Sequence, residues 1–554
     1  MYACRGCGGT LKFDIASQQL KCESCSNEYN PYDMEQATEA EQDDYDVTVF
    51  KCPQCGGEIY STDNTAAGFC SFCGASTVLT GRLKKEKRVN YIIPFKQTKE
   101  DCKKAYKKLM RHAIFAPKEL KDEKNIDGFR GIYMPYWVYY VKQQGHVRIH
   151  GTKSHRSGDY IITRHYGLHM DLDAHYKGLS YDASSSFADT ISKKLAPYNV
   201  KNMKAFTPSY LSGFYADMSD VPPQIYGEEA KEFAADETIH FVKNSREAKG
   251  YSLDSTDKLR RMLPTNVEQT NSAMFPVWFL SYQNKGRVAY ATVNGQTGKV
   301  VADLPVDIKK YLFGSLILAI PIILLLNAML TLRPSVVLSM VSVLAAIVVC
   351  VHASEMKQIA VAENYEDDIG AQIGMENKQK MEQAAREQAA REMAGDLEDL
   401  VDTPYVVTEA NTKKNKTAKG RKNVGGMIGV TIFMIPIFSM LIWPVLAGFL
   451  RGSESCVLAL IALIIAIIGT SSSVSHAKRI TAVRNMGTAG ALAAVILAFM
   501  ILFWNPVSDL WYYGGVIAAL LTVGFTLMDL IRSYNVLATR RLPQFDYRGG
   551  DDLA

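Results

Sequence analysis

Eight of the eleven cysteines fall into two groups with the same internal spacing. Each group holds two C-x2-C pairs separated by fourteen residues, and the second group repeats the first 48 residues later. Four thiolates suit Zn²⁺, which binds them in a tetrahedron with bonds of about 2.3 Å. Because sulfur would fill every position, no place is left for substrate or water, and we predict two structural zinc ions. The predicted ligands are Cys4, Cys7, Cys22, Cys25, Cys52, Cys55, Cys70 and Cys73.

Iron binding and a redox dithiol are the alternatives for these cysteines. A disulfide framework suits small secreted domains. The first residues, MYACRGCGG, have neither the basic nor the apolar region of a signal peptide. We therefore expect reduced thiols in the cytoplasm.

Short hairpins must position these ligands. In the first unit the spacer fits one strand at 10–13 and a second at 19–21, with glycines beside the cysteine pairs. A segment of about 30 residues buries too little apolar surface to fold alone, so the metal supplies folding energy. The sequence therefore predicts zinc ribbons at 1–30 and 51–80, joined by an acidic linker at 31–50.

The charge around the ribbons argues against nucleic-acid binding. Residues 31–50 hold seven acidic side chains and no basic one, and residues 52–73 hold no lysine or arginine. Phosphate recognition needs several basic side chains at each site. We therefore predict no nucleic-acid partner and expect the ribbons to bind protein.

A β-rich cytoplasmic domain is predicted for residues 90–306. The segment YMPYWVYY is echoed by MFPVWFLSY, and we expect Pro135 and Pro276 at strand starts. The run from Gly131 to Thr152 is interpreted as a hairpin with Gly145 near its turn. The sequence NGQTG at 294–298 predicts another hairpin turn.

Polar residues alternate with apolar ones in ITRHYGLHMDLDAHYKG. On a strand they would share one face that could bind a metal, although a solvated face is the favoured interpretation. These residues are His165, His169, Asp171, Asp173 and His175. No catalytic motif accompanies them: Ser184 lacks a G-x-S-x-G context, and there is no phosphate-binding glycine loop. The sequence therefore predicts a protein that is not an enzyme.

Six stretches are long and apolar enough to span a bilayer at about 20 residues each. They form a hairpin (311–353) and a group of four (425–532), separated by a helix and basic linker (354–424) and followed by a tail (533–554). The predicted spans are 311–332, 334–353, 425–449, 454–474, 487–505 and 510–531.

The positive charges predict the orientation of these spans. With both termini in the cytoplasm, fifteen lysines and arginines flank the spans inside and two lie outside. We therefore predict a multi-pass plasma-membrane protein whose basic linker meets anionic lipid. Few ionisable groups lie in the spans, with His352 and Asp529 near their ends. The spans are interpreted as an anchor, with a transporter as the alternative.

Three segments stand between the two ribbons and the membrane helices: APYNVKNMKAFTPSYLSGFYADMSD, FPVWFLSY and VNGQTGKVVADLPVD. Together with the ribbons and the helices, they resemble the bacterial YdjG-like zinc-ribbon membrane proteins. Such proteins are often labelled as transcription-factor-type ribbons or primosomal-helicase-like, although this chain lacks the nucleotide-binding loop of a helicase. The resemblance covers residues 1–353. It implies a scaffold that holds phage-shock-protein-A-like or flotillin-like (SPFH) proteins at the membrane during envelope stress.

The predicted fold is therefore multidomain: two tandem zinc ribbons, a mixed β-rich cytoplasmic domain and a helical membrane region of six spans. The predicted function is a non-enzymatic membrane scaffold or adaptor. The alternative is a transporter or lipid-handling protein with a zinc-ribbon regulatory head. The oligomeric state is left open.

Overall fold

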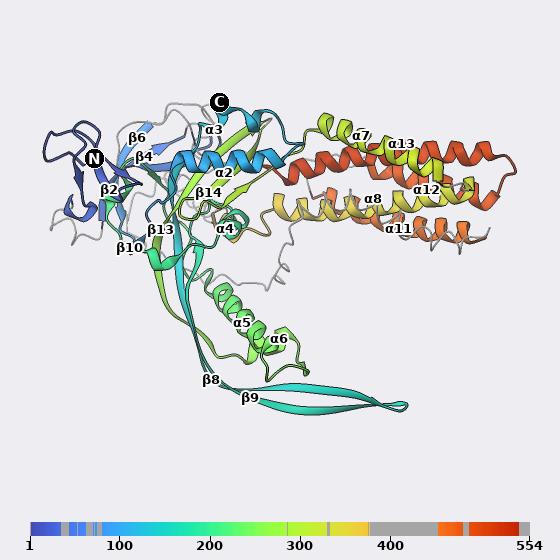
Figure 1. The fold of residues 1–554 in the computed structure, drawn as a ribbon, viewed down its shortest axis with the longest axis horizontal. Coiled ribbons are helices and arrows are strands. Elements are labelled where there is room, and N and C mark those ends of the chain that lie inside the picture. The colour runs from blue at the N-terminus through green and yellow to red at the C-terminus, as the bar shows by residue number, and fades with distance from the viewer. Residues whose placement is uncertain are drawn as a thin grey trace, which may run out of the picture.

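The fold has three parts along one axis: a cysteine-rich end, a sheet domain and a helix bundle (Figure 1). The structure is a computed structural model. The residues it describes are 2–34, 44–52, 54–61, 70, 72–74, 80–284, 286–329, 333–374, 376, 453–479 and 487–541.

Two sheets form the cysteine-rich end and the domain behind it. The first is antiparallel, in the order β1 (Leu11–Asp14), β2 (Gln19–Cys22), β3 (Glu28–Tyr29). The second contains thirteen strands among the described residues, with the central order β10-β7-β13-β8-β11-β5-β4-β6. Its strands are β4 (Asp44–Lys51), β5 (Glu58–Ser61), β6 (Thr80–Lys87), β7 (Tyr91–Ile92), β8 (Arg130–Ser157), β9 (Tyr160–Asp182), β10 (Lys204–Ala205), β11 (Tyr215–Ala216), β12 (Ser252–Leu253), β13 (Thr265–Asn284), β14 (Arg287–Asn294), β15 (Val300–Ala302) and β16 (Arg540–Arg541).

Short helices surround this sheet. The first long one, α2, begins with a capping box in which Thr98 and Asp101 each accept from the other's backbone. Its buried residues Cys102, Tyr106 and Met110 recur every four positions, as an amphipathic helix requires. The helices are η1 (Pro31–Met34), α2 (Lys99–His112), η2 (Glu119–Lys121), α3 (Glu123–Ile126), α4 (Asp189–Leu195), η3 (Val200–Asn202), η4 (Pro208–Leu211), α5 (Gly227–Asn244) and α6 (Thr256–Met262).

The echoed segments become neighbouring antiparallel strands, with Met274 opposite Pro135 and Pro276 opposite Tyr133. The expectation that both prolines start strands is wrong, because each lies inside its strand. On its other side, β8 pairs with β11 before Pro135 and with β9 after it. Likewise β13 pairs with β7 before Pro276 and with β14 after it. Each proline therefore lies where its strand changes neighbour, and its missing N–H is tolerated there.

The predicted turn at Gly145 is also wrong. Strand β8 runs straight through this position, where Gly145 pairs with Leu172 of β9. The turn lies at Gly158, with a φ of 63°, between the paired residues Ser157 and Tyr160. The predicted turn at 294–298 is confirmed, since β14 and β15 pair across it and Gly298 has a φ of 77°.

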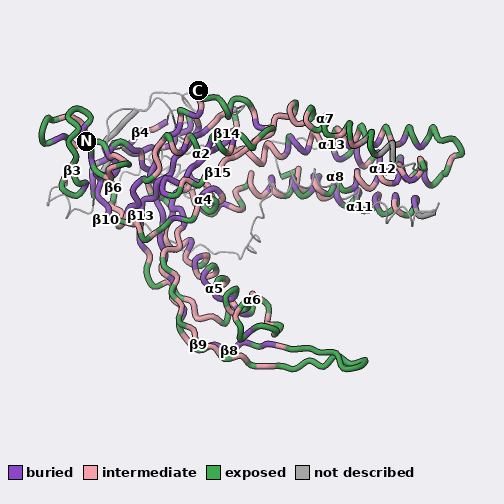
Figure 2. The backbone as a smooth tube through the Cα atoms, viewed as in Figure 1, coloured by how far each residue is buried: buried purple, intermediate pink, exposed green. Residues whose placement is uncertain are grey.

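The core covers both faces of the central strands. Tyr133 and Trp278 pack on one face, whereas Tyr136 and Phe275 pack on the other, as the alternation along a strand requires. The rings of Tyr136 and Phe275 stack with centroids 4.5 Å apart. Figure 2 shows the buried residues concentrated here, whereas the far end of the β8–β9 hairpin is exposed.

Apolar helices project from the other end of the domain: α7 (Ile308–Met329), α8 (Pro334–Glu363), α11 (Ser453–Ala477), α12 (Gly487–Trp504) and α13 (Asp509–Leu537). Small residues line their contacts, so the backbones approach closely, as in many membrane bundles. Buried examples are Ala345, Ala346, Ala462 and Ala466.

The prediction of six spans is corrected by the structure. Within the described residues, three helices are long and apolar enough to cross a membrane. The apolar helix Thr488–Trp504 is shorter, and at 1.5 Å per residue its length falls below a hydrocarbon layer of about 30 Å. Helix α7, over the first predicted span, is not among the three, and the predicted span 425–449 lies outside the described residues. The three helices are Pro334–Glu363, Ser455–Ala477 and Asp509–Leu537.

Candidate metal centres

The first cysteine group closes around the β1–β2 hairpin, in which Leu11 pairs with Cys22. The Sγ atoms of Cys4 and Cys25 lie 3.5 Å apart, and those of Cys7 and Cys22 lie 3.4 Å apart. All four sulfurs lie within 4.8 Å of one another, so the group could hold a metal ion.

All four C-x2-C pairs of the chain share one backbone turn. The residue after each second cysteine has a positive φ, which glycine adopts without strain. Its N–H donates to the carbonyl of the first cysteine of the pair, at 2.8–3.0 Å. The four residues, with their φ angles, are Gly8 (71°), Ser26 (59°), Gly56 (76°) and Gly74 (76°).

Tyr29 is a further residue of the first group. Strand β3 places its hydroxyl oxygen 3.2 Å from Cys4 Sγ. This hydrogen bond lowers the pKa of the Cys4 thiol to about 6, which favours the thiolate form that binds metal. The cysteine spacing gives no sign of this residue, because β3 brings it to the sulfur from outside the hairpin.

The second group has the dimensions of a zinc site. The distances from Cys52 Sγ to Cys73 Sγ and from Cys55 Sγ to Cys70 Sγ are both 3.8 Å. A tetrahedron with bonds of 2.3 Å has edges of about 3.8 Å. The four sulfurs also lie within 4.8 Å of one another. Donor set and spacing therefore both fit Zn²⁺.

Burial makes a cation necessary at the second group if its thiols ionise. All four cysteines are buried, in a small core with Phe50, Ile59 and Phe72. The hydrogen bond with Cys55 lowers the pKa of Cys52, whereas the bond with Cys52 raises the pKa of Cys55. Without a cation, one thiolate therefore suppresses ionisation of its neighbour.

The second group is built into the large sheet, since β4, β5 and β6 are strands of that sheet. The Ser281 hydroxyl donates to the Cys70 carbonyl at 3.4 Å, and the Tyr290 hydroxyl donates to the Phe72 carbonyl at 2.7 Å. Gly74 lies so close to β13 that the Cβ of any larger residue there would be 3.3 Å from the Ser281 carbonyl oxygen. The first group is more peripheral, because its Cys7 and Cys25 are exposed.

The predicted polar face of β9 contains the expected residues, and β8 adds two histidines that the sequence analysis missed. His146 Nδ1 lies 2.8 Å from Asp171 Oδ1, and its Nε2 lies 3.2 Å from His169 Nδ1. Across the same hairpin, His150 Nε2 lies 2.9 Å from His165 Nδ1.

His175 lies apart from these pairs, with Nε2 3.3 Å from Asp173 Oδ1. Four histidines of the face thus meet in two pairs. Among the described residues, three or more ligand atoms converge only in the two cysteine groups. Residues 136–157 of β8 pair with β9 and bring the two histidines to this face. The alternation of His146 and His150 with Val147 and Ile149 was the signal in the sequence that could have revealed them.

Ser184 is part of a buried hydroxyl cluster. Its hydroxyl donates to Asp217 Oδ2 at 2.5 Å, and the Ser186 hydroxyl donates to the same oxygen. Burial raises the pKa of Asp217 to about 6. These bonds tie Ser184 and Ser186 to one buried carboxylate oxygen.

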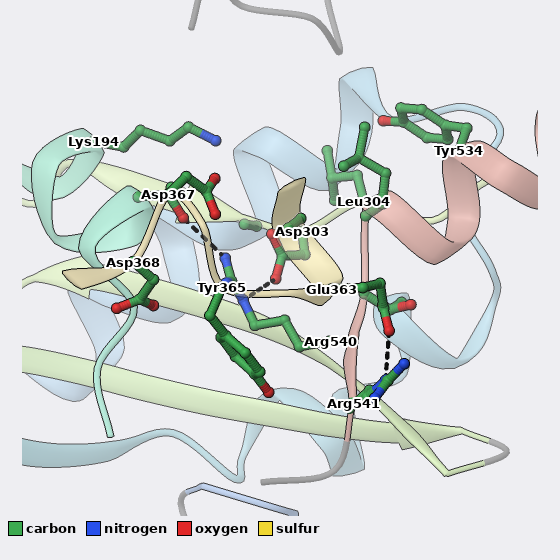
Figure 3. Close-up of a pocket in the computed structure, with 16 residues that line it drawn as sticks. Lys194, Asp303, Leu304, Glu363, Tyr365, Asp367, Asp368, Tyr534, Arg540 and Arg541 are labelled. Carbon is green, nitrogen blue, oxygen red and sulfur yellow. Dashed lines mark hydrogen bonds and ion pairs between the residues drawn. The ribbon is translucent and has the colours of Figure 1, made fainter. Parts of the chain in front are cut away.

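A cavity of about 440 Å³ lies where the sheet domain meets α8 and α13 (Figure 3). Ion pairs cross its walls: Arg541 Nε lies 2.5 Å from Glu363 Oε2, and Arg540 Nε lies 3.8 Å from Asp303 Oδ2. The charges that line the cavity are therefore largely used to join the domain to the helices.

These features define a multidomain protein with two tetracysteine groups, a mixed-sheet domain and C-terminal apolar helices. The chain is similar to the "Uncharacterized protein YdjG" of Bacillus subtilis (strain 168), with 27% identity over 312 residues. The match spans 55% of this chain and 90% of the relative. No family model and no solved structure matches the chain. The similarity supports the expected YdjG-like relationship at a distant level.

Proposed function

We propose that this protein is a non-enzymatic membrane scaffold whose cysteine-rich head, folded by two structural zinc ions, recruits partner proteins to the membrane. The supporting observation is the placement of the first ribbon. It lies at the end of the molecule opposite the apolar helices (Figure 1), with two cysteines exposed. The ribbon thus offers a surface away from the helices, and four sulfur ligands leave its metal no catalytic position.

The first ribbon is held rigidly on the sheet domain. Phe13 packs against Tyr210 with ring centroids 5.2 Å apart, and its N–H donates to the Ser212 carbonyl at 3.0 Å. Gln18 Nε2 donates to the Phe95 carbonyl at 2.7 Å. A fixed surface loses less conformational entropy on binding than a tethered one, which favours a docking role.

The resemblance to YdjG-like proteins suggests the partners: phage-shock-protein-A-like or flotillin-like (SPFH) proteins, recruited during envelope stress. The proposed location is the plasma membrane, with both termini in the cytoplasm and the basic linker against anionic lipids. The surface of the first ribbon carries few free cations, since Lys12 pairs with Glu23 at 2.6 Å. This agrees with a protein partner rather than nucleic acid.

Crosslinking in native membranes, followed by identification of the bound proteins, tests this proposal. We expect Cys7→Ser with Cys25→Ser to abolish partner recovery, because their loss unfolds the exposed ribbon. Cys456→Ser, at a lone cysteine in the helix bundle, is the matched control and should leave recovery unchanged. Equal recovery from both variants, at equal protein levels in the membrane, would refute the scaffold role of the ribbon.

One observation favours the alternative of a transporter or lipid-handling protein. Inside the helix bundle, the buried His352 lies 3.0 Å from the Ser473 hydroxyl and 3.3 Å from Asp529. Glu355 is buried nearby on α8, and its carboxylate oxygens have no hydrogen-bond partner among the described residues. Ionisable groups inside membrane helices often line ion paths. Proton flux into vesicles holding the purified protein, abolished by Asp529→Asn, would favour this alternative.

A further inference from the structure

The β8–β9 hairpin forms a long arm, whose far end is residues 153–164. The base of the arm is covered, since Ile149 packs with Ile239 of α5 and Leu259 of α6. The short strand β12 pairs with the arm at Gly151 and Thr152. Beyond this point the two strands pair with each other, and Figure 2 shows this part as largely exposed.

The tip of the arm carries large apolar side chains in solvent. Tyr160, Ile161 and Ile162 are 77%, 74% and 43% exposed. They directly follow the turn at Gly158, a place where polar residues are usual. Exposed apolar side chains that gather at one place mark an interaction site.

Cations surround these apolar residues. Between positions 154 and 164 the sequence holds two arginines, Arg156 and Arg164, and a single carboxylate, Asp159. Lys153 is directly opposite Arg164 in the strand register, and its Nζ lies 3.9 Å from the ring centroid of Tyr251 at the base of the arm. Two like charges in this position repel each other unless an anion lies between or beside them. The tip thus combines exposed apolar groups with unneutralised positive charge.

The direction of the arm identifies the surface it meets. Figure 1 shows its far part bending to run in the direction of the helix bundle, so that the tip ends level with the helices along the long axis. Three of these helices are long and apolar enough to span a membrane. The tip therefore points toward the same bilayer that the helices would occupy.

We propose that the tip of the arm docks on the bilayer, with Tyr160, Ile161 and Ile162 in the headgroup region and Arg156 and Arg164 against anionic lipid. Tyrosine is favoured at this depth, and the cytoplasmic leaflet is negatively charged. The hairpin has open strand edges, whose unpaired N–H and C=O groups exclude it from the hydrocarbon. The contact is therefore interfacial. It rests on the membrane location in the proposed function and adds a second attachment that would fix the tilt of the head.

Photocrosslinking of the full chain in lipid nanodiscs tests this inference. We expect p-benzoylphenylalanine in place of Ile161 to form a lipid adduct, visible by intact mass, when one third of the lipid is phosphatidylglycerol. With phosphatidylcholine alone the yield should fall several-fold. The matched control is the same probe at Phe241 on α5, which is 76% exposed and should give no adduct. No adduct at Ile161, equal adducts at both sites, or a crosslink between two protein chains would each overturn the inference.

Charge reversal provides a second measurement. With the probe at Ile161, Arg156→Glu and Arg164→Glu together should reduce the lipid adduct to the Phe241 level. Lys108→Glu, at an exposed site on α2 in the head (Figure 1), should leave it unchanged. An adduct that resists the double reversal would contradict the role of anionic lipid. Partner recovery in native membranes is measured in the same variants. If partner recovery persists when the lipid adduct is lost, the scaffold function does not depend on the contact of the tip with lipid. The two proposals can therefore fail separately.

Discussion

Arg287 on β14 and Glu363 at the end of α8 form an ion pair, with 2.6 Å between Nη2 and Oε1. The same guanidinium donates to the carbonyls of Val536 and Thr539 at 2.8 and 2.9 Å. Arg541 binds the second oxygen of Glu363. One arginine on the sheet thus contacts the end of α8, the last turn of α13 and the segment after it.

Arg287→Ala should loosen this junction. It removes one of the two arginines that bind the buried Glu363, together with a donor to the Thr539 carbonyl. Because Arg541 still pairs with Glu363, we expect a loss of about 2 kcal/mol. We expect faster hydrogen exchange in residues 536–541, with little change in the first ribbon. Glu363→Gln keeps an acceptor and should have a smaller effect. If exchange at the junction is the same in Arg287→Ala and the unmodified protein, the ion pair does not hold the two parts together.

The two metal centres should differ when a ligand is removed. Cys55→Ser opens a buried centre inside the large sheet, so we expect loss of one zinc ion and a large fall in the midpoint of thermal unfolding. Cys7→Ser opens a centre with two exposed ligands and should lose one zinc ion with a smaller fall in that midpoint, because Leu11, Phe13 and Leu20 still pack in the core of the sheet domain. Metal analysis and thermal unfolding of both variants measure this difference. Equal destabilisation by the two changes would show that the first ribbon contributes as much to the core as the second.

Ser26→Gly should stabilise the first ribbon. Ser26 is the one member of the four equivalent turn positions that is not glycine, and its φ of 59° lies in the left-handed region. A side chain costs about 1 kcal/mol there, and glycine removes this strain. Slower zinc loss to a chelator is the expected result. Gly8→Ala is the opposing control and should accelerate the loss, while unchanged rates in both variants would contradict the strain argument.

Asp368 should make the local structure pH-dependent. Burial raises its pKa to about 7, with the charge of Asp189 adding to the effect. In the unfolded chain its pKa is about 3.9, so the folded state binds the proton more tightly. The stabilisation is complete below about pH 4 and is lost as the pH rises through 7. Hydrogen exchange of residues 364–372, corrected for the intrinsic rate, should therefore be slower at pH 5 than at pH 8.

Asp368→Asn is the control for this pH effect. Its side-chain oxygen can still accept from the Ala371 N–H, which donates to Asp368 at 2.9 Å. The facing charges are Asp189, Asp367 and Arg540, and they remain in the variant. We expect the difference between pH 5 and pH 8 to shrink at least several-fold. A difference that persists in full would assign it to the neighbouring carboxyl groups instead.

The ribbons could be predicted because their signal is local. A C-x2-C turn is closed by a hydrogen bond within five residues, such as Gly56 N–H to the Cys52 carbonyl at 2.8 Å. The strand errors have a different origin. Gly145 suggests a turn by residue type, yet β9 pairs past it, and Pro135 is tolerated because β8 changes neighbours there. Within the described residues, hydropathy located the apolar helices, but three of them rather than all are long and apolar enough to cross a membrane.

Residue spacing by itself determined where the two tetracysteine groups form, because the geometry of metal ligands is set within each short loop. The hydropathy pattern of the sequence likewise determined that apolar helices follow a β-rich domain. The tertiary structure alone decided that the second group is buried in the large sheet, that Tyr29 reaches Cys4, and that the far part of the arm runs in the same direction as the helices (Figure 1). These features depend on pairing between strands far apart in the chain, whose free energy comes from contacts that no local pattern encodes.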